Sequence, residues 1–187
     1  MAASVACPTI RWVVSPEPPP AYARAVVKPL VARQSKVVPG PADVPFGMLS
    51  ELPLDRIYRR WYWVIPPIRR VIYDDGEWNS VGQRRTMVLR GGSAIAEVVH
   101  VEAPTSFGYR LSSMTGLLAP LISRVEGNVD LVAVAGGTEV TWQWTIHPRS
   151  ILAVLPVYIF ARLWPSWALK ALDYLAAQVA EPGRSTT

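Results

Sequence analysis

Short extended segments, separated by turn-forming residues, fill the chain between residues 68 and 147. In the clearest of them, Val140, Trp142, Trp144 and Ile146 alternate with polar residues. Alternation at a period of two is the pattern of a β-strand that buries one face. The same reasoning predicts six strands, at residues 68–74, 83–90, 94–102, 107–113, 123–134 and 138–147.

Turn-forming residues between these segments indicate how the strands connect. Gly91-Gly92 lies between the second and third predicted strands, and Gly136-Gly137 lies between the last two. Glycine adopts the positive φ angles that tight hairpin turns require. We therefore predict that consecutive strands pair in an antiparallel meander.

A long amphipathic helix is predicted after the last strand. Its apolar stripe includes Trp164, Ala168, Leu172 and Leu175, which recur at intervals of three and four. This spacing places the four side chains on one helix face, which needs a covering partner. Because proline is well accepted in the first turn of a helix, we predict the helix over residues 165–181, packed on the apolar face of the sheet.

Smaller elements precede the predicted sheet. Residues 31–38 are suited to a short strand, and the turn-forming Pro39-Gly40-Pro41 ends it. Apolar residues at helical spacing then predict two short helices, over residues 42–52 and 54–63. The expected fold class is therefore α+β, with a curved antiparallel sheet wrapped around a long C-terminal helix.

Length and composition fit one domain between two less structured ends. A chain of 187 residues, of which 50% are hydrophobic, can bury a substantial core in a single domain. Residues 1–30 contain six prolines, which favour an extended chain, so we expect a flexible extension there. We place the folded domain at residues 31–181 and a disordered tail at residues 182–187.

Charge and cysteine content narrow the classes of function. The net charge is +5, but the basic residues occur mainly as short doublets such as Arg59-Arg60, without the long basic run of a nucleic-acid-binding tail. Cys7 is the only cysteine, so zinc-binding cysteine motifs are excluded. We expect a cytoplasmic protein that holds no metal or cofactor and binds no nucleic acid. The sequence does not indicate the oligomeric state.

The order of the predicted elements resembles the helix-grip fold of the SRPBCC (START-like) superfamily. Within it, the chain is most similar to members of the polyketide cyclase/dehydrase and lipid-transport type. The motifs RRWYW at residues 59–63 and GGTEVTW at residues 136–142 carry part of this resemblance, which covers residues 31–181. It implies a hydrophobic cavity between sheet and helix that holds lipids, polyketides or other apolar molecules. Only some members are catalytic, so fold alone does not choose between carrier and enzyme.

Large aromatic side chains are the first candidates to line such a cavity, because they offer much contact area at little cost in rotamer freedom. An ordinary packed core is the alternative interpretation of most of them. Trp61 and Trp63 are expected to flank the cavity entrance, where a packed hinge would explain them equally well. The predicted ligand-binding residues are Trp61, Trp63, Met87, Tyr109, Trp142, Trp144 and Trp167.

No complete catalytic set is recognisable in the sequence. His100 and Tyr109 are the candidates to move protons if the protein is a cyclase-like or aromatase-like enzyme, although a lone histidine in a strand is more often a surface residue. Arg85 or Arg110 could meet an anionic ligand group, but an arginine on an exposed sheet face is the commoner case. A carrier or sensor of a hydrophobic small molecule is therefore the first hypothesis.

A third hypothesis comes from the apolar segment that begins at Ile151 and ends at Leu163. Pro156 and Arg162 interrupt it, and its uncharged run is about half of the ~20 residues that are needed to span a bilayer. We therefore expect no membrane span. Peripheral contact of this segment with a membrane surface remains open.

Overall fold

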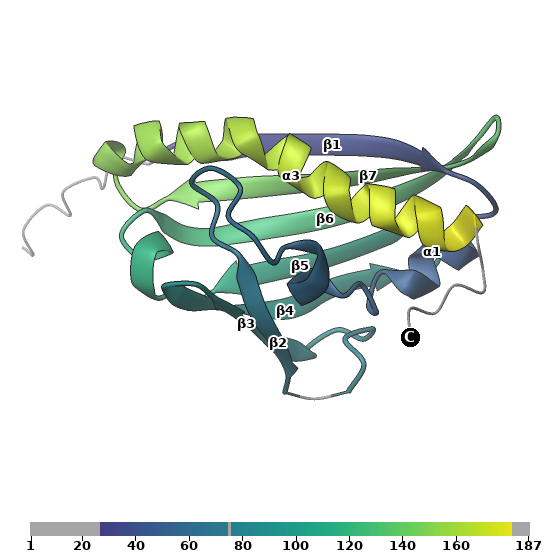
Figure 1. Ribbon diagram of the computed structural model, residues 1–187, viewed down its shortest axis with the longest axis horizontal. Coiled ribbons are helices and arrows are strands. Elements are labelled where there is room, and N and C mark those ends of the chain that lie inside the picture. Colours follow the sequence, from purple (N-terminus) through teal and green to yellow (C-terminus); the bar gives the residue numbers. More distant parts are fainter. Residues whose placement is uncertain (1–26, 75, 181–187) are drawn as a thin grey trace, which may run out of the picture.

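The computed structural model of the protein describes residues 27–74 and 76–180, which form a seven-stranded antiparallel sheet and a long helix (Figure 1). The strands are β1 (Leu30–Val38), β2 (Ile68–Tyr73), β3 (Arg84–Leu89), β4 (Gly92–Glu102), β5 (Ser106–Ser112), β6 (Ile122–Val134) and β7 (Gly137–Pro148). The helices are α1 (Asp43–Met48), α2 (Leu54–Ile57) and α3 (Val154–Ala180), with short 3-10 turns at Gly116–Leu118 and Ile151–Ala153.

The sheet order is β1-β7-β6-β5-β4-β3-β2, so the strands from β2 to β7 pair consecutively and β1 closes the edge beside β7. All six strands that the alternation predicts between residues 68 and 147 are present, as is the predicted strand near the N-terminus. Every pairing is antiparallel, as the glycine-rich turns indicate. The curved sheet and the long C-terminal helix confirm the α+β helix-grip fold.

Helix α3 covers one face of the sheet and lies along β1 and β7 (Figure 1). The predicted apolar stripe faces the sheet, since Trp164, Ala168 and Leu175 are fully buried. On β7 the alternation also holds, because Val140 and Ile146 are fully buried. The core therefore forms where the apolar sides of β7 and α3 meet.

The start of the closing helix is a correction to the sequence prediction. Helix α3 begins at Val154, eleven residues before the predicted start at Pro165, which lies inside the helix. Proline there removes one helical hydrogen bond and typically costs about 3 kcal/mol. Burial of Phe160 and Ala161 on the same face continues the helix through the proline, so packing outweighs the local preference.

The second small helix, in contrast to α3, is shorter than predicted. Helix α2 ends at Ile57, and residues 58–67 form a loop that contains a bridge between Tyr62 and Ile65. Trp63 has a φ of +54°, which is incompatible with a right-handed helix. The apolar spacing in this region therefore reflects separate contacts of Leu54 and Tyr58, both buried, instead of one helix face.

The predicted ends of the chain fall largely outside the described residues. The tail expected at residues 182–187 lies wholly outside them, and of the extension expected at residues 1–30 only the last four residues are described. Both remain predictions.

In the middle of the sheet, a tyrosine ring packs closely on a glycine of the neighbouring strand. Tyr109 on β5 pairs with Gly127 on β6, and its ring lies directly over this glycine. A Cβ atom added at Gly127 would lie 2.2 Å from Cζ of Tyr109, which is far inside van der Waals contact. Only glycine at this position lets the tyrosine lie flat across the sheet.

We therefore expect Gly127→Ala to lower the free energy of unfolding by about 1–3 kcal/mol, because the methyl group forces the buried Tyr109 ring away. Gly47→Ala is the matched control, since nothing lies within 4 Å of its added Cβ. Urea denaturation of both variants measures the difference. Equal stability of Gly127→Ala and the parent protein would contradict this account of the sheet.

Candidate functional site

Tyr109 is the polar centre of an otherwise apolar interior. Its hydroxyl accepts one hydrogen bond from Nε1 of Trp142 at 2.8 Å and another from Nε1 of Trp144 at 2.6 Å. All three side chains are buried. Burial raises the pKa of Tyr109 to about 12, and the two indole hydrogen bonds act against this rise. The phenol is therefore protonated at neutral pH.

Aromatic rings from the sheet and from α3 form a continuous layer around this centre. The Trp164 ring centroid lies 5.4 Å from that of Trp142 and 5.0 Å from that of Trp144. Tyr58, at the end of α2, stacks on Trp167 with 3.6 Å between centroids. Contacts of this kind add to the hydrophobic gain from burial. This aromatic layer joins β7, α2 and α3.

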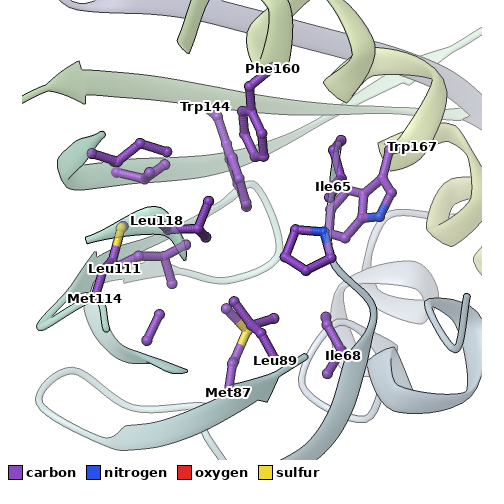
Figure 2. Close-up of a pocket in the computed structure, with 14 residues that line it drawn as sticks. Ile65, Ile68, Met87, Leu89, Leu111, Met114, Leu118, Trp144, Phe160 and Trp167 are labelled. Carbon is purple, nitrogen blue, oxygen red and sulfur yellow. The ribbon is translucent and has the colours of Figure 1, made fainter. Parts of the chain in front are cut away.

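A first cavity lies beside this layer (Figure 2). Trp144 from β7 and Phe160 from α3 lie next to one another in it, with 6.2 Å between their ring centroids. Its volume is about 40 Å³, and its lining consists of apolar residues from the sheet, from α3 and from the loops between them. The lining residues are Ile65, Pro66, Ile68, Met87, Leu89, Ala94, Leu111, Met114, Leu118, Ile122, Val125, Trp144, Phe160 and Trp167.

A second cavity of about 30 Å³ lies at the other end of the aromatic layer. Its lining includes Tyr109 and Trp142, and it contains one charged side chain, that of Arg85. The remaining lining residues are Leu49, Leu52, Leu54, Phe107, Val129 and Leu172. The hydrogen-bonded group of Tyr109, Trp142 and Trp144 thus contributes residues to both cavities.

Both cavities are small. Each holds only a few water-sized molecules, whereas sites for drug-sized ligands usually measure about 300–1,000 Å³. The aromatic side chains occupy most of the space between the sheet and α3. A ligand larger than a few atoms therefore requires these side chains to move.

The structure brings five of the predicted ligand-binding residues into the cavity walls. Met87, Trp144 and Trp167 line the first cavity, while Tyr109 and Trp142 line the second. The roles of these residues in binding remain predictions.

Trp61 and Trp63 lie elsewhere. They belong to the 58–67 loop, are 43% and 78% exposed, and line neither cavity. Ile65 in the same loop does line the first cavity. The loop, but not its tryptophans, therefore reaches the apolar interior.

His100 and Tyr109 are not brought together. Tyr109 is buried beneath α3, whereas His100 is exposed and lies 3.7 Å from Glu102. A Cβ atom added at Gly108 would lie 3.1 Å from Cβ of His100, and Gly108 faces away from its neighbour Tyr109. His100 therefore lies on the outer face of the sheet. Among residues 27–74 and 76–180, no cluster of three or more His, Cys, Asp or Glu side chains could hold a metal ion.

Most of the lining residues were not among the predicted ligand-binding residues, and Phe160 and Arg85 are two of these. Phe160 was missed because the helix was expected to begin after it. For Arg85 the sequence left open either contact with an anionic ligand group or the commoner exposed sheet face, and the side chain is 4% exposed and lies on the inner side. The alternation of β3 carried the signal, since Arg85 precedes the predicted cavity residue Met87 by two positions.

Comparisons with known proteins agree with this architecture. Ginseng major latex-like protein 151 from Panax ginseng superposes with a TM-score of 0.63 at 12% identity, over 82% of this chain and 99% of its own. The protein TTHA0849 from Thermus thermophilus gives a TM-score of 0.62 at 14% identity, over 82% and 99%. DynU16, from the dynemicin biosynthetic locus, gives 0.50 at 16% identity, over 81% of this chain and 48% of its own.

At these identities the solved structures show the fold alone. No curated protein matches the sequence. The family described as "Polyketide cyclase / dehydrase and lipid transport" matches residues 29–180, which is most of the chain. The protein therefore belongs to the polyketide cyclase/dehydrase and lipid-transport family of the SRPBCC superfamily.

Proposed function

We propose that the protein binds a hydrophobic small molecule, such as a lipid or a polyketide, between the sheet and α3. The observation that carries this proposal is the lining of the first cavity, in which every side chain is apolar. Leu89 and Leu118 in this lining are partly exposed, so the cavity approaches the surface there. An apolar ligand would gain free energy by leaving water without depriving any polar wall group of a partner.

Binding requires the cavity to expand, and its lining is suited to this. Met87 and Met114 are flexible side chains that adapt to irregular shapes. The 58–67 loop, which provides Ile65 and Pro66, is held by few backbone hydrogen bonds, among them the pair between Tyr62 and Ile65. Movement of this loop together with Phe160 would enlarge the cavity without altering the sheet.

The placement of His100 favours a carrier or sensor over an enzyme. A proton-transfer group must come within hydrogen-bonding reach of its substrate, and His100 lies on the other side of the sheet. Tyr109 remains the candidate for a cyclase-like enzyme, and the origin of DynU16 in a biosynthetic locus is one parallel for that class. Turnover of a polyketide by the His100→Ala variant at the parent rate would remove His100 from that alternative.

We expect the neutral dye Nile red to bind the parent protein saturably, with an increase in its fluorescence. Leu118→Asp should weaken this binding at least about tenfold, because the new carboxylate in the apolar wall must be desolvated. The matched control is Leu117→Asp, since Leu117 is 58% exposed and lines neither cavity. We expect its affinity to stay within about twofold of that of the parent protein. If the parent protein takes up no dye, or if both variants bind equally well, the proposed binding site is wrong.

A second property, peripheral membrane contact, is favoured by the surface at the start of α3. Ile151, Leu152 and Leu155 are 70%, 87% and 68% exposed. The stretch Ile151–Ala180 is long and apolar enough to cross a membrane by length and composition, but its inner side packs on the sheet. We infer that the exposed turns lie in a membrane surface while the domain stays outside it, which fits a protein of the cytoplasm.

The distribution of charge supports this inference. Residues 56–73 contain five arginines and residues 148–172 contain three basic residues, and neither segment contains an acidic one. These two segments together have a net charge of +8. The whole chain has 19 basic and 14 acidic residues, so the rest of it has 11 basic and 14 acidic residues and a net charge of −3. Ile65 and Phe160 both line the first cavity, so the two segments lie side by side. Anionic lipid would complement such a surface.

We expect the protein to float with vesicles that contain phosphatidylserine, more weakly with phosphatidylcholine alone, and less at high salt because ions screen the attraction. Leu155→Asp should reduce the floated fraction severalfold. Val132→Asp is the matched control, since Val132 is similarly exposed, at 57%, on strand β6. Failure of the parent protein to float, or equal flotation of both variants, would rule out this contact surface.

A further inference from the structure

Arg85 is a buried cation that faces the second cavity. Its side chain lies on β3, is 4% exposed, and stacks on the ring of Trp78, with 3.3 Å between Cζ and the ring centroid. The ring centroid of Tyr73, its partner in the β2–β3 pairing, lies 6.0 Å from the guanidinium carbon, and the Tyr73 hydroxyl is a neighbouring acceptor that favours the charged form of Arg85. Arginine is charged at neutral pH even where burial lowers its pKa, as it does here. The cavity therefore contains a full positive charge.

This charge has no anionic partner among the described residues. No carboxylate of residues 27–74 or 76–180 lies within 4 Å of the guanidinium, and Nε and Nη1 are buried without any hydrogen-bond acceptor. Stacking on Trp78 satisfies only the face of the guanidinium group, while its N–H groups point outward in the plane. Buried charges in proteins are normally paired, so the unpaired donors call for an acceptor.

Two further polar groups near Arg85 are donors. Nε1 of Trp78 is buried and has no acceptor. The Tyr109 hydroxyl already accepts two indole N–H groups, so its own hydrogen is available to donate. Arg85 and Tyr109 both lie in the lining of this cavity and offer hydrogen-bond donors there, while Trp78 lies against the face of the Arg85 guanidinium. A carboxylate, which only accepts hydrogen bonds and carries the opposite charge, is the complementary group.

The size and the remaining walls of the cavity define the rest of the ligand. A volume of about 30 Å³ suits a group as small as a carboxylate. Leucine side chains from α2, α3 and the segment that joins α1 to α2 form the opposite wall, and Trp142 leads from this cavity toward the aromatic layer. The carboxylate must therefore belong to a molecule that is otherwise apolar.

We infer that the second cavity is a binding site for the carboxylate of an apolar acid, with Arg85 as its ion-pair partner and the hydrocarbon part directed toward Trp142. This inference rests on the proposed function and specifies its ligand class. It also explains why an arginine occupies the inner side of β3, where its neighbour on that side is the apolar Met87.

The test compares dodecanoic acid with dodecanol as competitors of Nile red, because the two differ only in the charged end. We expect the parent protein to bind the acid at least about tenfold more tightly than the alcohol, as one charge-assisted contact allows. Arg85→Met should abolish this preference while leaving dodecanol binding within about twofold. Arg110→Met is the control, since Arg110 is exposed on β5, and it should keep the preference.

A measurement on the parent protein covers the case in which Arg85→Met does not fold. The bound acid, labelled with ¹³C at its carboxyl carbon, should stay ionised to a pH about one unit or more below that of the free acid, because a nearby cation favours the charged form. Equal binding of acid and alcohol, or an unshifted carboxyl titration, overturns the carboxylate site but leaves the proposed function intact. If acetate competes with Nile red at the same concentration as dodecanoic acid, the ligand needs no apolar tail and that part of the inference is wrong. If the parent protein takes up no Nile red, both the proposed function and the carboxylate site are wrong.

Discussion

The packing of α3 on the aromatic side of β7 is the interaction on which the rest of the structure depends. Trp164 is fully buried between the two elements and contacts both Trp142 and Trp144. Without this cover, the inner face of the sheet would expose the rings of Trp142 and Trp144 to water, at a cost of roughly 2 kcal/mol or more for each. The same packing holds Pro165 inside a helix, which a weaker contact would not do.

The aromatic layer also decides how much room is left. A sheet that curves around a helix leaves space at its centre, and here large rings fill much of it and leave the two small cavities described above. Tyr109 can lie flat across the sheet, in the wall of the second cavity, only because Gly127 has no side chain. The interior is thus organised by a few large side chains with defined orientations, so a ligand would meet a small number of movable groups and not a fluid core.

The sequence predicted the sheet well because alternation is a local signal that tertiary packing reinforces. It failed where the two compete. Pro165 favours a helix start by local rules, but burial of Phe160 keeps the preceding turns helical. Among the site residues, Trp144 followed from alternation, whereas for Arg85 the residue type made exposure the commoner expectation beside contact with an anionic group, although it shares a face with Met87. The tendency of arginine to be exposed is an average, and the buried Arg85 is an exception to it.

The proposed uptake of a ligand requires the closed interior to open. Opening the two hydrogen bonds to Tyr109 would cost about 2 kcal/mol, at roughly 1 kcal/mol for each neutral bond. An apolar chain that removes about 300 Å² from water gains about 7 kcal/mol, at ~25 cal/mol per Å². Pairing of Arg85 with an anion would add to this gain, because the desolvation of the arginine is already present in the empty protein. The balance therefore favours a ligand that is long, apolar and charged at one end.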